Sequence, residues 1–505
     1  MPSKSDNFIY MKSKIYSLLF LTSFSLVLSQ NINFADANFK NALLPFQDVN
    51  GDGQISLSEA QNATYINIDT NNNITNLGGI EHYPNLTILM IKNNPISAPL
   101  NLSQNTQLQN LRLGFGTAVT SVDLTGLAQL KYLSIGVASN TLINVLNKPL
   151  LEEIIIEGTL SGGLSSIDVS QNPLLKKLWI NNNNLTSIDV TQNPVLEELV
   201  LQKDPNLPNS ISSINVTQNP LLTIIAVPGH SLLPSIDVTM NPLLQHLNIG
   251  ATSITSLNLT NNPLLKTLAI DHNNFSNGIN LSQVPLLEQF NGFQSQLSNL
   301  SFSNNPNLQA ISVGNNYLTT LNLSNLQQLI NFSAVNNLFT SLDLTNNISL
   351  QYVSFTSNQL MKYINIKNGY NQNIVWLHIS DYQFMPQLTG ICVDDSNSSY
   401  ASKVKVAVGN NVLVTSNCSL LSTQEAAQKN LSLKVFPNPT DDILYVETKE
   451  KLIDYSIFSM SGQKISADIF RNNEKNVNVK NLLHGNYIIQ IKTNRQTYTN
   501  KIVKK

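Results

Sequence analysis

Residues 175–193 read LKKLWINNNNLTSIDVTQN, and closely related stretches recur along most of the chain. The returning phrase is SIDVSQNP at Ser166, SIDVTQNP at Ser187, SINVTQNP at Ser213, SIDVTMNP at Ser235 and SLNLTNNP at Ser256. Its first apolar position recurs in steps of 21 to 26 residues between Leu77 and Ile364. A fixed period of this size indicates a solenoid, in which each unit buries its apolar face only against its neighbours.

One unit shows how the repeat folds. Leu178 and Ile180 are spaced by two, so both side chains point to one side of a short strand. Asn183 follows three residues later, where its amide can supply hydrogen bonds to the backbone of adjacent turns. The same slot holds Asn94, Asn273, Asn316, Asn337 and Asn358. A second apolar pair, Ile188 and Val190, predicts a short strand on the return side.

The pattern L-x-x-L-x-L-x-x-N-x-L resembles the leucine-rich repeat family over residues 76–380. This resemblance implies a mostly β, α/β-type solenoid: a curved stack of about 14 repeats with short parallel strands and the ligand side on the concave face. Some units place other residues in the asparagine slot, among them His230 and Thr252. There we expect the asparagine ladder to be interrupted.

Residues that alternate with the buried strand positions should face the concave side. Besides Glu153 and Glu157, the candidates for ligand contact are Arg112, Tyr132, Trp179, His246, His272, Phe293 and Tyr352. Exposed aromatic rings there could stack on sugars or anchor a protein partner. The alternative is that these aromatics are scattered surface residues, because they lie several repeats apart.

Residues 48–59 read DVNGDGQISLSE, which matches a twelve-residue EF-hand calcium loop. The ligand positions fall on Asp48, Asn50, Asp52, Gln54 (through its carbonyl), Ser56 and Glu59, with Gly53 at the sharp turn. The chemistry requires hard oxygen ligands at alternate positions and a terminal bidentate carboxylate. The alternative is an Asp/Asn/Gly-rich turn that binds nothing.

Helices are expected on both sides of this loop. The entering helix should be capped by Asp36 and run through Phe39 and Leu43, and a short exit helix should run from Ser58 to Ala63. A bound Ca²⁺ would have a structural role, because it would stiffen the cap that covers the apolar end of the first repeat.

The N-terminal segment has the pattern of a secretory signal peptide. Lys12 and Lys14 precede an apolar run at residues 15–28, with small residues near Ser29. We expect cleavage near Ser29, with Met11 as an alternative start to Met1. No cysteine follows that position, so a lipoprotein anchor is not indicated.

Only two cysteines are present, Cys392 and Cys418, and they lie 26 residues apart. In an exported protein this pair predicts a single disulfide; two unpaired buried thiols are the alternative.

The C-terminal segment changes character to short strands separated by turns. It contains Phe436-Pro437-Asn438-Pro439, Leu483-x-Gly485-x-Tyr487 and a basic tail at residues 501–505. These motifs resemble the C-terminal sorting domain of type IX secretion, which implies export across the outer membrane and contact with that secretion machinery. The alternative is an ordinary small antiparallel β-sandwich.

Together these features divide the chain into six parts. They are a signal peptide (1–29), an N-terminal cap (30–75), leucine-rich repeats (76–380), a disulfide-bearing C-terminal cap (381–420), a linker (421–430) and the sorting domain (431–505). We expect a protein that is secreted or attached to the outer cell surface, with no transmembrane segment in the mature chain.

Composition and motifs narrow the function classes. The net charge is -2 with 12% charged residues and no basic stripe, so binding to nucleic acid is not expected. The six histidines are scattered and no catalytic motif appears, so we do not expect an enzyme. The sequence predicts a recognition or adhesion protein whose ligand is a protein or polysaccharide. A structural coat component without a specific ligand is the alternative.

Overall fold

The computed structural model describes residues 30–114, 116–139, 141–159, 162–204, 211–374, 376–378, 385–409, 411–419, 433–448, 450–460, 462–471, 474–494 and 497–505. The chain divides into two compact units, Met1–Asn273 (unit 1) and Asn274–Lys505 (unit 2). The predicted signal peptide and linker lie outside the described residues. The repeats form a mostly β solenoid of about 15 turns with parallel strands, which confirms the predicted fold class.

Unit 1 begins with two helices, α2 (Ala37–Gln47) and α3 (Leu57–Asn62). Asp36 is the N-cap of α2, as predicted, and its side chain accepts the N–H of Asn38. Phe39 and Leu43, four residues apart on α2, are both buried. A capping box between Ser56 and Glu59 starts α3 one residue earlier than predicted.

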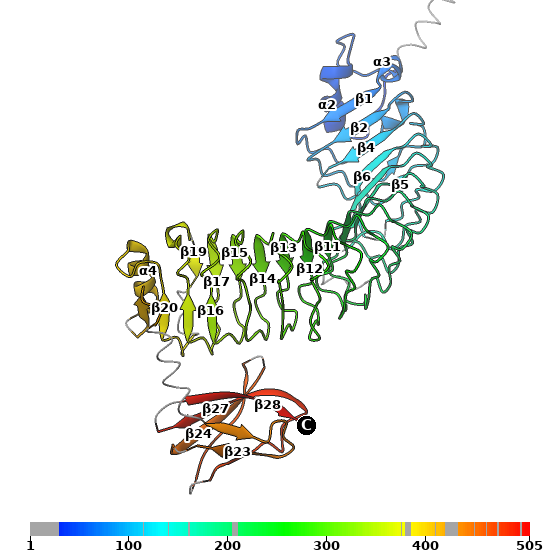
Figure 1. The fold of residues 1–505 in the computed structure, drawn as a ribbon. Helices are drawn as coiled ribbons and strands as arrows, with labels where there is room; N and C mark the ends of the chain where they lie inside the picture. The colour runs from blue at the N-terminus through cyan, green and yellow to red at the C-terminus, as the bar shows by residue number, and fades with distance from the viewer. Residues whose placement is uncertain are drawn as a thin grey trace, which may run out of the picture. The chain divides into compact units, whose positions relative to one another are not determined.

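Unit 1 stacks one strand per turn into a parallel sheet (Figure 1). In order these strands are β1 (Tyr65–Ile68), β2 (Ile88–Ile91), β4 (Asn110–Leu113), β6 (Tyr132–Gly136), β7 (Glu153–Glu157), β8 (Lys177–Asn181), β9 (Glu198–Val200), β10 (Ile224–Ala226), β11 (His246–Asn248) and β12 (Thr267–Ala269). A 3-10 helix, η1 (Ile80–His82), lies between β1 and β2 in the chain. Successive strands pair in register, so equivalent residues of successive turns lie side by side.

The return side of unit 1 differs from the sequence prediction. Two short strands pair there, β3 (Leu100–Asn101) and β5 (Val122–Asp123). The strand expected at residues 188–190 is absent from this described turn, so that prediction is wrong. In this turn Asp189 Oδ1 accepts both the N–H and the hydroxyl of Thr191. Asp123 of β5 makes the same backbone bond, so this bond does not explain why the strand is absent here.

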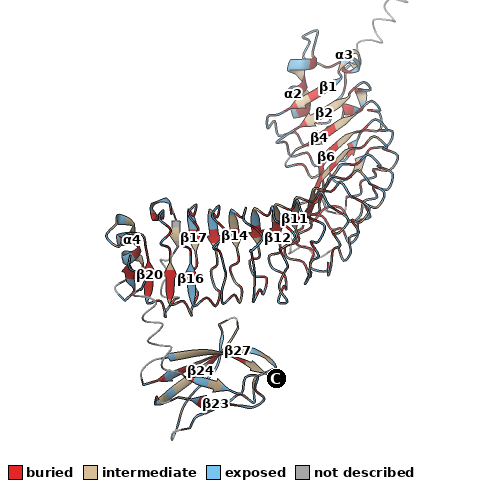
Figure 2. Cartoon of the chain, viewed as in Figure 1, coloured by how far each residue is buried: buried red, intermediate tan, exposed pale blue. Residues whose placement is uncertain are grey.

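Burial alternates along each strand of the parallel sheet (Figure 2). In β8, Leu178 and Ile180 are buried, whereas Lys177, Trp179 and Asn181 are half-buried on the opposite face. Each buried aliphatic side chain contributes roughly 1.5–3 kcal/mol relative to exposure. The spacing of two that predicted the strand therefore also determines which side chains face outward.

The asparagine slot works as predicted. Asn183 Nδ2 donates to the carbonyl of Ile156 in the preceding turn, and its Oδ1 accepts the N–H of Leu164. Equivalent bonds are made by Asn94, Asn273, Asn316, Asn337 and Asn358. These amides donate to backbone carbonyls at the C-terminal ends of the strands or just beyond them.

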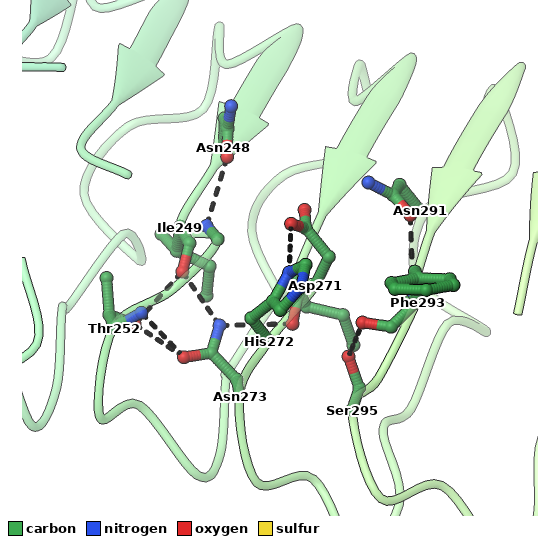
Figure 3. Close-up of polar contacts among 12 residues, drawn as sticks. Asn248, Ile249, Thr252, Asp271, His272, Asn273, Asn291, Phe293 and Ser295 are labelled. Carbon is green, nitrogen blue, oxygen red and sulfur yellow. Dashed lines mark hydrogen bonds and ion pairs between the residues drawn. The ribbon is translucent and has the colours of Figure 1, made fainter. Parts of the chain in front are cut away.

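The expected interruption of this ladder at His230 and Thr252 does not occur. The His230 ring accepts the N–H of Ile211 at Nδ1 (3.2 Å) and lies 2.7 Å from the Leu201 carbonyl at Nε2. Thr252 donates its hydroxyl to either the Ile249 carbonyl or Asn273 Oδ1, and its backbone N–H donates to Asn273 Oδ1 (Figure 3). Other polar side chains thus replace the missing amide.

A second asparagine ladder runs along the return side. Asn219 Nδ2 donates to the carbonyls of Val190 and Asn193 in the preceding turn, both at 2.8 Å. The Asn219 carbonyl in turn accepts from Asn241 of the next turn. These residues are the asparagines of the recurring Q-N-P phrase, to which the sequence pattern alone assigned no role.

Unit 2 continues the same pattern. Its parallel strands are β13 (Gln289–Asn291), β14 (Ala310–Ser312), β15 (Asn331–Ser333), β17 (Tyr352–Ser354) and β19 (Trp376–His378). A second parallel sheet forms on the return side, from β16 (Ser341–Asp343), β18 (Tyr363–Asn365), β20 (Gly390–Cys392) and β21 (Leu413–Thr415). Two helices, η2 (Asn371–Asn373) and α4 (Ser399–Val408), accompany this end. The predicted Cys392–Cys418 disulfide is present.

The C-terminal region is a two-layered antiparallel β structure. One sheet contains β22 (Lys434–Phe436), β23 (Ile443–Glu447) and β26 (Asn476–Asn478). The other contains β25 (Lys464–Ile469), β24 (Leu452–Ser459), β27 (Gly485–Thr493) and β28 (Thr497–Lys504). Leu444 and Val477 of the first sheet share one core with Ile457 and Ile489 of the second.

Candidate functional site

Charged and aromatic side chains gather on the outward face of the unit 1 sheet. Arg112 on β4 forms an ion pair with Glu153 on β7, with 3.2 Å between Nη2 and Oε1. The Arg112 guanidinium also lies 5.5 Å from the ring centroid of Tyr132 on β6. Two residues predicted to contact ligand, Arg112 and Tyr132, are therefore in contact with each other.

A second cluster lies on β8 and β9. The Lys177 ammonium lies 3.8 Å from the ring centroid of Trp179, a cation–π contact. Lys177 also pairs with Glu198 at 3.3 Å, and both of these side chains are about one quarter exposed. Such partly exposed ion pairs contribute little stability, about 0–1 kcal/mol, so their main effect is to fix side-chain positions.

An apolar strip runs beside these charges. The strand register pairs Ile155 of β7 with Trp179 of β8, and Trp179 with Val200 of β9. Ile155, Trp179 and Val200 are all half-buried on the outward face. A large aromatic ring is thus flanked by an aliphatic side chain on each neighbouring strand.

We call this surface the unit 1 patch. It consists of Arg112, Tyr132, Glu153, Ile155, Lys177, Trp179, Glu198 and Val200. Its four charged side chains form two ion pairs, Arg112 with Glu153 and Lys177 with Glu198. The sequence prediction missed Ile155, Lys177, Glu198 and Val200, although aligning each unit on its strand would have placed them in the same outward columns.

The two predicted histidines lie outside the patch. His246 on β11 places Nδ1 2.8 Å from the Thr267 hydroxyl. His272 follows β12 in a turn, with a φ of 56°, and its Nδ1 lies 3.0 Å from Asp271 Oδ2 (Figure 3). In the described part of the chain, no contact joins the two histidine side chains to each other.

Phe293 and Tyr352 belong to unit 2. Phe293 follows β13 and is half-buried, and its backbone N–H donates to Asn291 Oδ1 (Figure 3). Tyr352 on β17 is 46% exposed and lies beside Asn331 of β15. Neither residue belongs to the unit 1 patch, so the sequence prediction that they bind ligand is a hypothesis separate from that surface, and Tyr352→Ala tests it.

The calcium-loop segment forms a tight turn between α2 and α3. Asp48 accepts the N–H groups of Gly51 and Asp52 at Oδ1 and of Gly53 at Oδ2. Gly51 and Gly53 have φ values of 73° and 76°, a conformation that glycine adopts without strain. The segment is therefore a hydrogen-bonded turn with glycine at its two left-handed positions.

Glu59 closes the segment from the other side. Its Oε1 accepts the N–H groups of Val49 and Asn50, and its Oε2 accepts the N–H and hydroxyl of Ser56. Partial burial acts to raise the pKa of Glu59, but these hydrogen bonds outweigh it and hold the pKa below its ordinary value. Glu59 is therefore a carboxylate at neutral pH.

The donor set of this loop is chemically suited to Ca²⁺. It contains three carboxylates (Asp48, Asp52, Glu59), the Asn50 amide and the Gln54 carbonyl, all oxygen donors. Among the described residues, no three His, Cys, Asp or Glu side chains are grouped closely enough to form a metal site. Calcium binding therefore stays a prediction.

Comparison with known families and structures agrees with a repeat region that is followed by a distinct C-terminal domain. Residues 434–505 match the family model described as the secretion system C-terminal sorting domain. The chain thus carries a C-terminal sorting domain, as its motifs predicted, and this domain indicates type IX secretion. No curated protein sequence matches the chain significantly.

Several solved structures are similar to this chain. The functional domain of InlJ from Listeria monocytogenes, which includes a cysteine ladder, is 22% identical with a TM-score of 0.50, over 95% of this chain and 99% of that one. YopM from Yersinia pestis, a leucine-rich effector protein, is 18% identical with a TM-score of 0.45, over 59% and 84%. An internalin from Listeria monocytogenes, InlF, is 15% identical with a TM-score of 0.36, over 77% and 98%. The similarity to InlJ supports a leucine-rich-repeat-like solenoid.

No helix within the described ranges is both long and apolar enough to cross a membrane.

Proposed function

We propose that this chain is an exported recognition protein that binds a protein ligand through the unit 1 patch. The observation that carries the proposal is Trp179, a large ring between Ile155 and Val200 whose position is fixed by Lys177. Protein-binding hot spots have this character, since they centre on Trp, Tyr or Arg side chains surrounded by a closely packed rim. The leucine-rich-repeat-like fold supports the same assignment.

The contacts of the aromatic rings favour a protein over a polysaccharide. A cation lies over one face of Trp179 and a second cation lies near the ring of Tyr132. A sugar stacks on an open ring face, whereas a protein side chain can pack against a ring edge and its aliphatic neighbours. Each ring thus has a cation near one face, and aliphatic side chains flank Trp179. This surface therefore suits an apolar side chain of a protein ligand.

The sorting domain supports the proposed location. We propose type IX export to the outside of the cell, with the repeats either released or attached to the surface. We also propose that Ca²⁺ binds at residues 48–59 and stiffens the cap formed by α2 and α3, a structural role. The proposal assigns no catalysis to the chain.

The test is a binding screen with the purified full-length chain. The chain is applied, in calcium-containing buffer, to an array of extracellular proteins and polysaccharides, alongside Trp179→Ala and the matched control Tyr352→Ala. We expect selective capture of a protein that Trp179→Ala weakens roughly 10- to 100-fold and Tyr352→Ala leaves unchanged. Selective capture of a polysaccharide, or no capture by a cooperatively folded sample, would contradict the proposal.

A further inference from the structure

A second concave surface lies at the N-terminal end of unit 1, between α2 and the first strand β1 (Figure 1). It is a cavity of about 560 Å³ lined by α2 residues that include Ala42, Pro45 and Phe46. The opposite wall is the continuous stretch of residues 65–70. None of these residues belongs to the unit 1 patch, so the two surfaces are separate.

The strand wall of this groove is a backbone edge. Within the described ranges, β1 pairs only with β2, so its other edge has no strand partner there. Successive side chains of a strand point to opposite faces, so a cavity that touches every residue from 65 to 70 must run along the strand edge. An edge strand presents N–H and C=O groups that can pair with another extended chain.

The helix wall supplies an apolar surface. Phe46 is 78% exposed although it lines the groove, and Tyr65 at the start of β1 is 49% exposed. Pro45 and Ala42 extend the same wall toward the start of α2. Large apolar side chains exposed next to an open strand edge are features of a surface that binds a partner.

Two polar side chains of the strand wall, Asn67 and Asp69, also line the groove. Asn67 Oδ1 is buried and has no hydrogen-bond partner among the described residues, while its Nδ2 donates to Asp69. Among the described residues that line the groove, Asp69 is the one charged side chain, and the hydrogen bond from Asn67 and the ion pair with Lys92 lower its pKa. The Asp69 side chain is 54% exposed, so its carboxylate is accessible from the groove although Lys92 pairs with it.

We propose that this groove binds an extended peptide segment of another protein as an added strand on β1. An apolar side chain of the peptide packs on Phe46, and a basic residue lies beside Asp69. Backbone hydrogen bonds to the β1 edge supply affinity, and the pockets for alternate side chains supply selectivity. Because the ion pair of Asp69 with Lys92 is about half exposed, a basic residue of the peptide can compete with Lys92 for the carboxylate, whereas an acidic residue would be repelled.

The test uses fluorescein-labelled peptides and the full-length chain. The probe is a short peptide of alternating valine and threonine with a lysine at each end; one matched peptide carries glutamate in place of lysine, and another carries proline at alternate positions. We expect saturable binding of the lysine peptide, weaker binding of the glutamate peptide and the weakest binding of the proline peptide, which lacks every second backbone N–H. Phe46→Ala should weaken binding roughly tenfold. Val49→Ala, a control position that is 85% exposed and outside the groove, should not.

Two further variants test the charge of the groove and its independence from the unit 1 patch. Asp69→Asn should abolish the preference for lysine over glutamate, and Trp179→Ala should leave peptide binding unchanged. The inference is overturned if no peptide binds to a folded sample, or if binding is insensitive to both Phe46→Ala and the proline peptide. It is also overturned if binding requires removal of residues 1–29 or dissociation of a dimer, because the groove would then hold this chain's own segment or a second copy.

Discussion

The Lys177 ammonium lies 3.8 Å from the ring centroid of Trp179 and 3.3 Å from Glu198 Oε2 on the neighbouring turn. One cation thus links the aromatic residue of one repeat to the carboxylate of the next. Arg112 and Glu153 form a second ion pair, so each charged side chain of the unit 1 patch has a partner of opposite charge in the free protein. The strand register places Lys177 beside Glu198, so the stacking of the repeats determines which side chains meet on the proposed recognition surface.

The first prediction concerns salt. Since the patch charges are paired with one another, long-range attraction should contribute little to ligand association. The association rate of the captured protein should change by less than about threefold between 50 and 500 mM NaCl, a range over which the Debye length falls severalfold. Stopped-flow or surface-based kinetics would measure it. A steep fall with salt would mean that the ligand recognises a net charge instead.

The return-side ladder predicts a stability effect at Asn219. Asn219→Ala removes two hydrogen bonds, while the carbonyls of Val190 and Asn193 each keep one backbone donor. The free energy of unfolding should fall by about 2 kcal/mol, the net contribution of two buried hydrogen bonds. Gln218→Ala, at the exposed neighbouring position, is the matched control and should change it by less than about 0.5 kcal/mol. Chemical denaturation measures both, and equal effects would show that the ladder does not stabilise the fold.

His230 predicts a pH dependence of stability. Burial lowers its pKa, and the charge of Lys203 adds to this, although the hydrogen bond to the Leu201 carbonyl opposes it. Because Ile211 N–H donates to Nδ1, the folded state requires the neutral ring with its proton on Nε2. The unfolded state binds a proton more readily, so stability is fully present above pH 6.5 and is lost as pH falls below that value.

The measurement is the melting temperature at pH 8 and pH 5. Wild type should lose more stability on acidification than His230→Asn, which places in this slot the residue that other turns use. His246→Asn, a half-buried position on the outward face, is the control and should follow wild type. An identical acid response of wild type and His230→Asn would contradict the account.

Much of the fold follows from sequence because the repeat is a local pattern. The spacing of Leu178 and Ile180 predicted β8 and its buried face, and the slot at Asn183 predicted the cross-turn amide. The replacement of that amide by His230 could not be predicted, since it depends on the distance of the ring from Leu201 and Ile211 across turns.

The candidate site was predicted only in part. Trp179, Tyr132 and Arg112 were identified as outward-facing because strand alternation places them there. Their cationic and carboxylate partners come from other turns or lie two residues away, so the contacts depend on register and side-chain conformation. His272 was also expected to face outward from a strand, but it lies in a turn after β12, next to Asp271. Its contact with a ligand stays a prediction.

Calcium provides a further prediction. With affinity of about 0.1–1 mM, typical of extracellular modules, 10 mM Ca²⁺ should stabilise the folded chain by roughly 1.4–2.7 kcal/mol. The melting temperature should therefore rise on adding Ca²⁺ to chelator-treated protein. Glu59→Gln keeps the size of the side chain and one acceptor oxygen, which can serve the N–H of either Val49 or Ser56 but not both. Because it lacks the carboxylate charge, it should lose this response. Identical melting curves of wild type with chelator and with Ca²⁺ would refute the calcium site.

The most direct test of the recognition surface is an alanine series measured against the captured protein ligand. We predict that affinity falls most at Trp179, roughly 10- to 100-fold, less at Ile155 and Val200, and not at all at Thr267 or Tyr352. Such a gradient, centred on Trp179 in a series of equally stable variants, is the expected signature of the unit 1 patch. Losses spread evenly along the repeats, or concentrated at Tyr352, would contradict it.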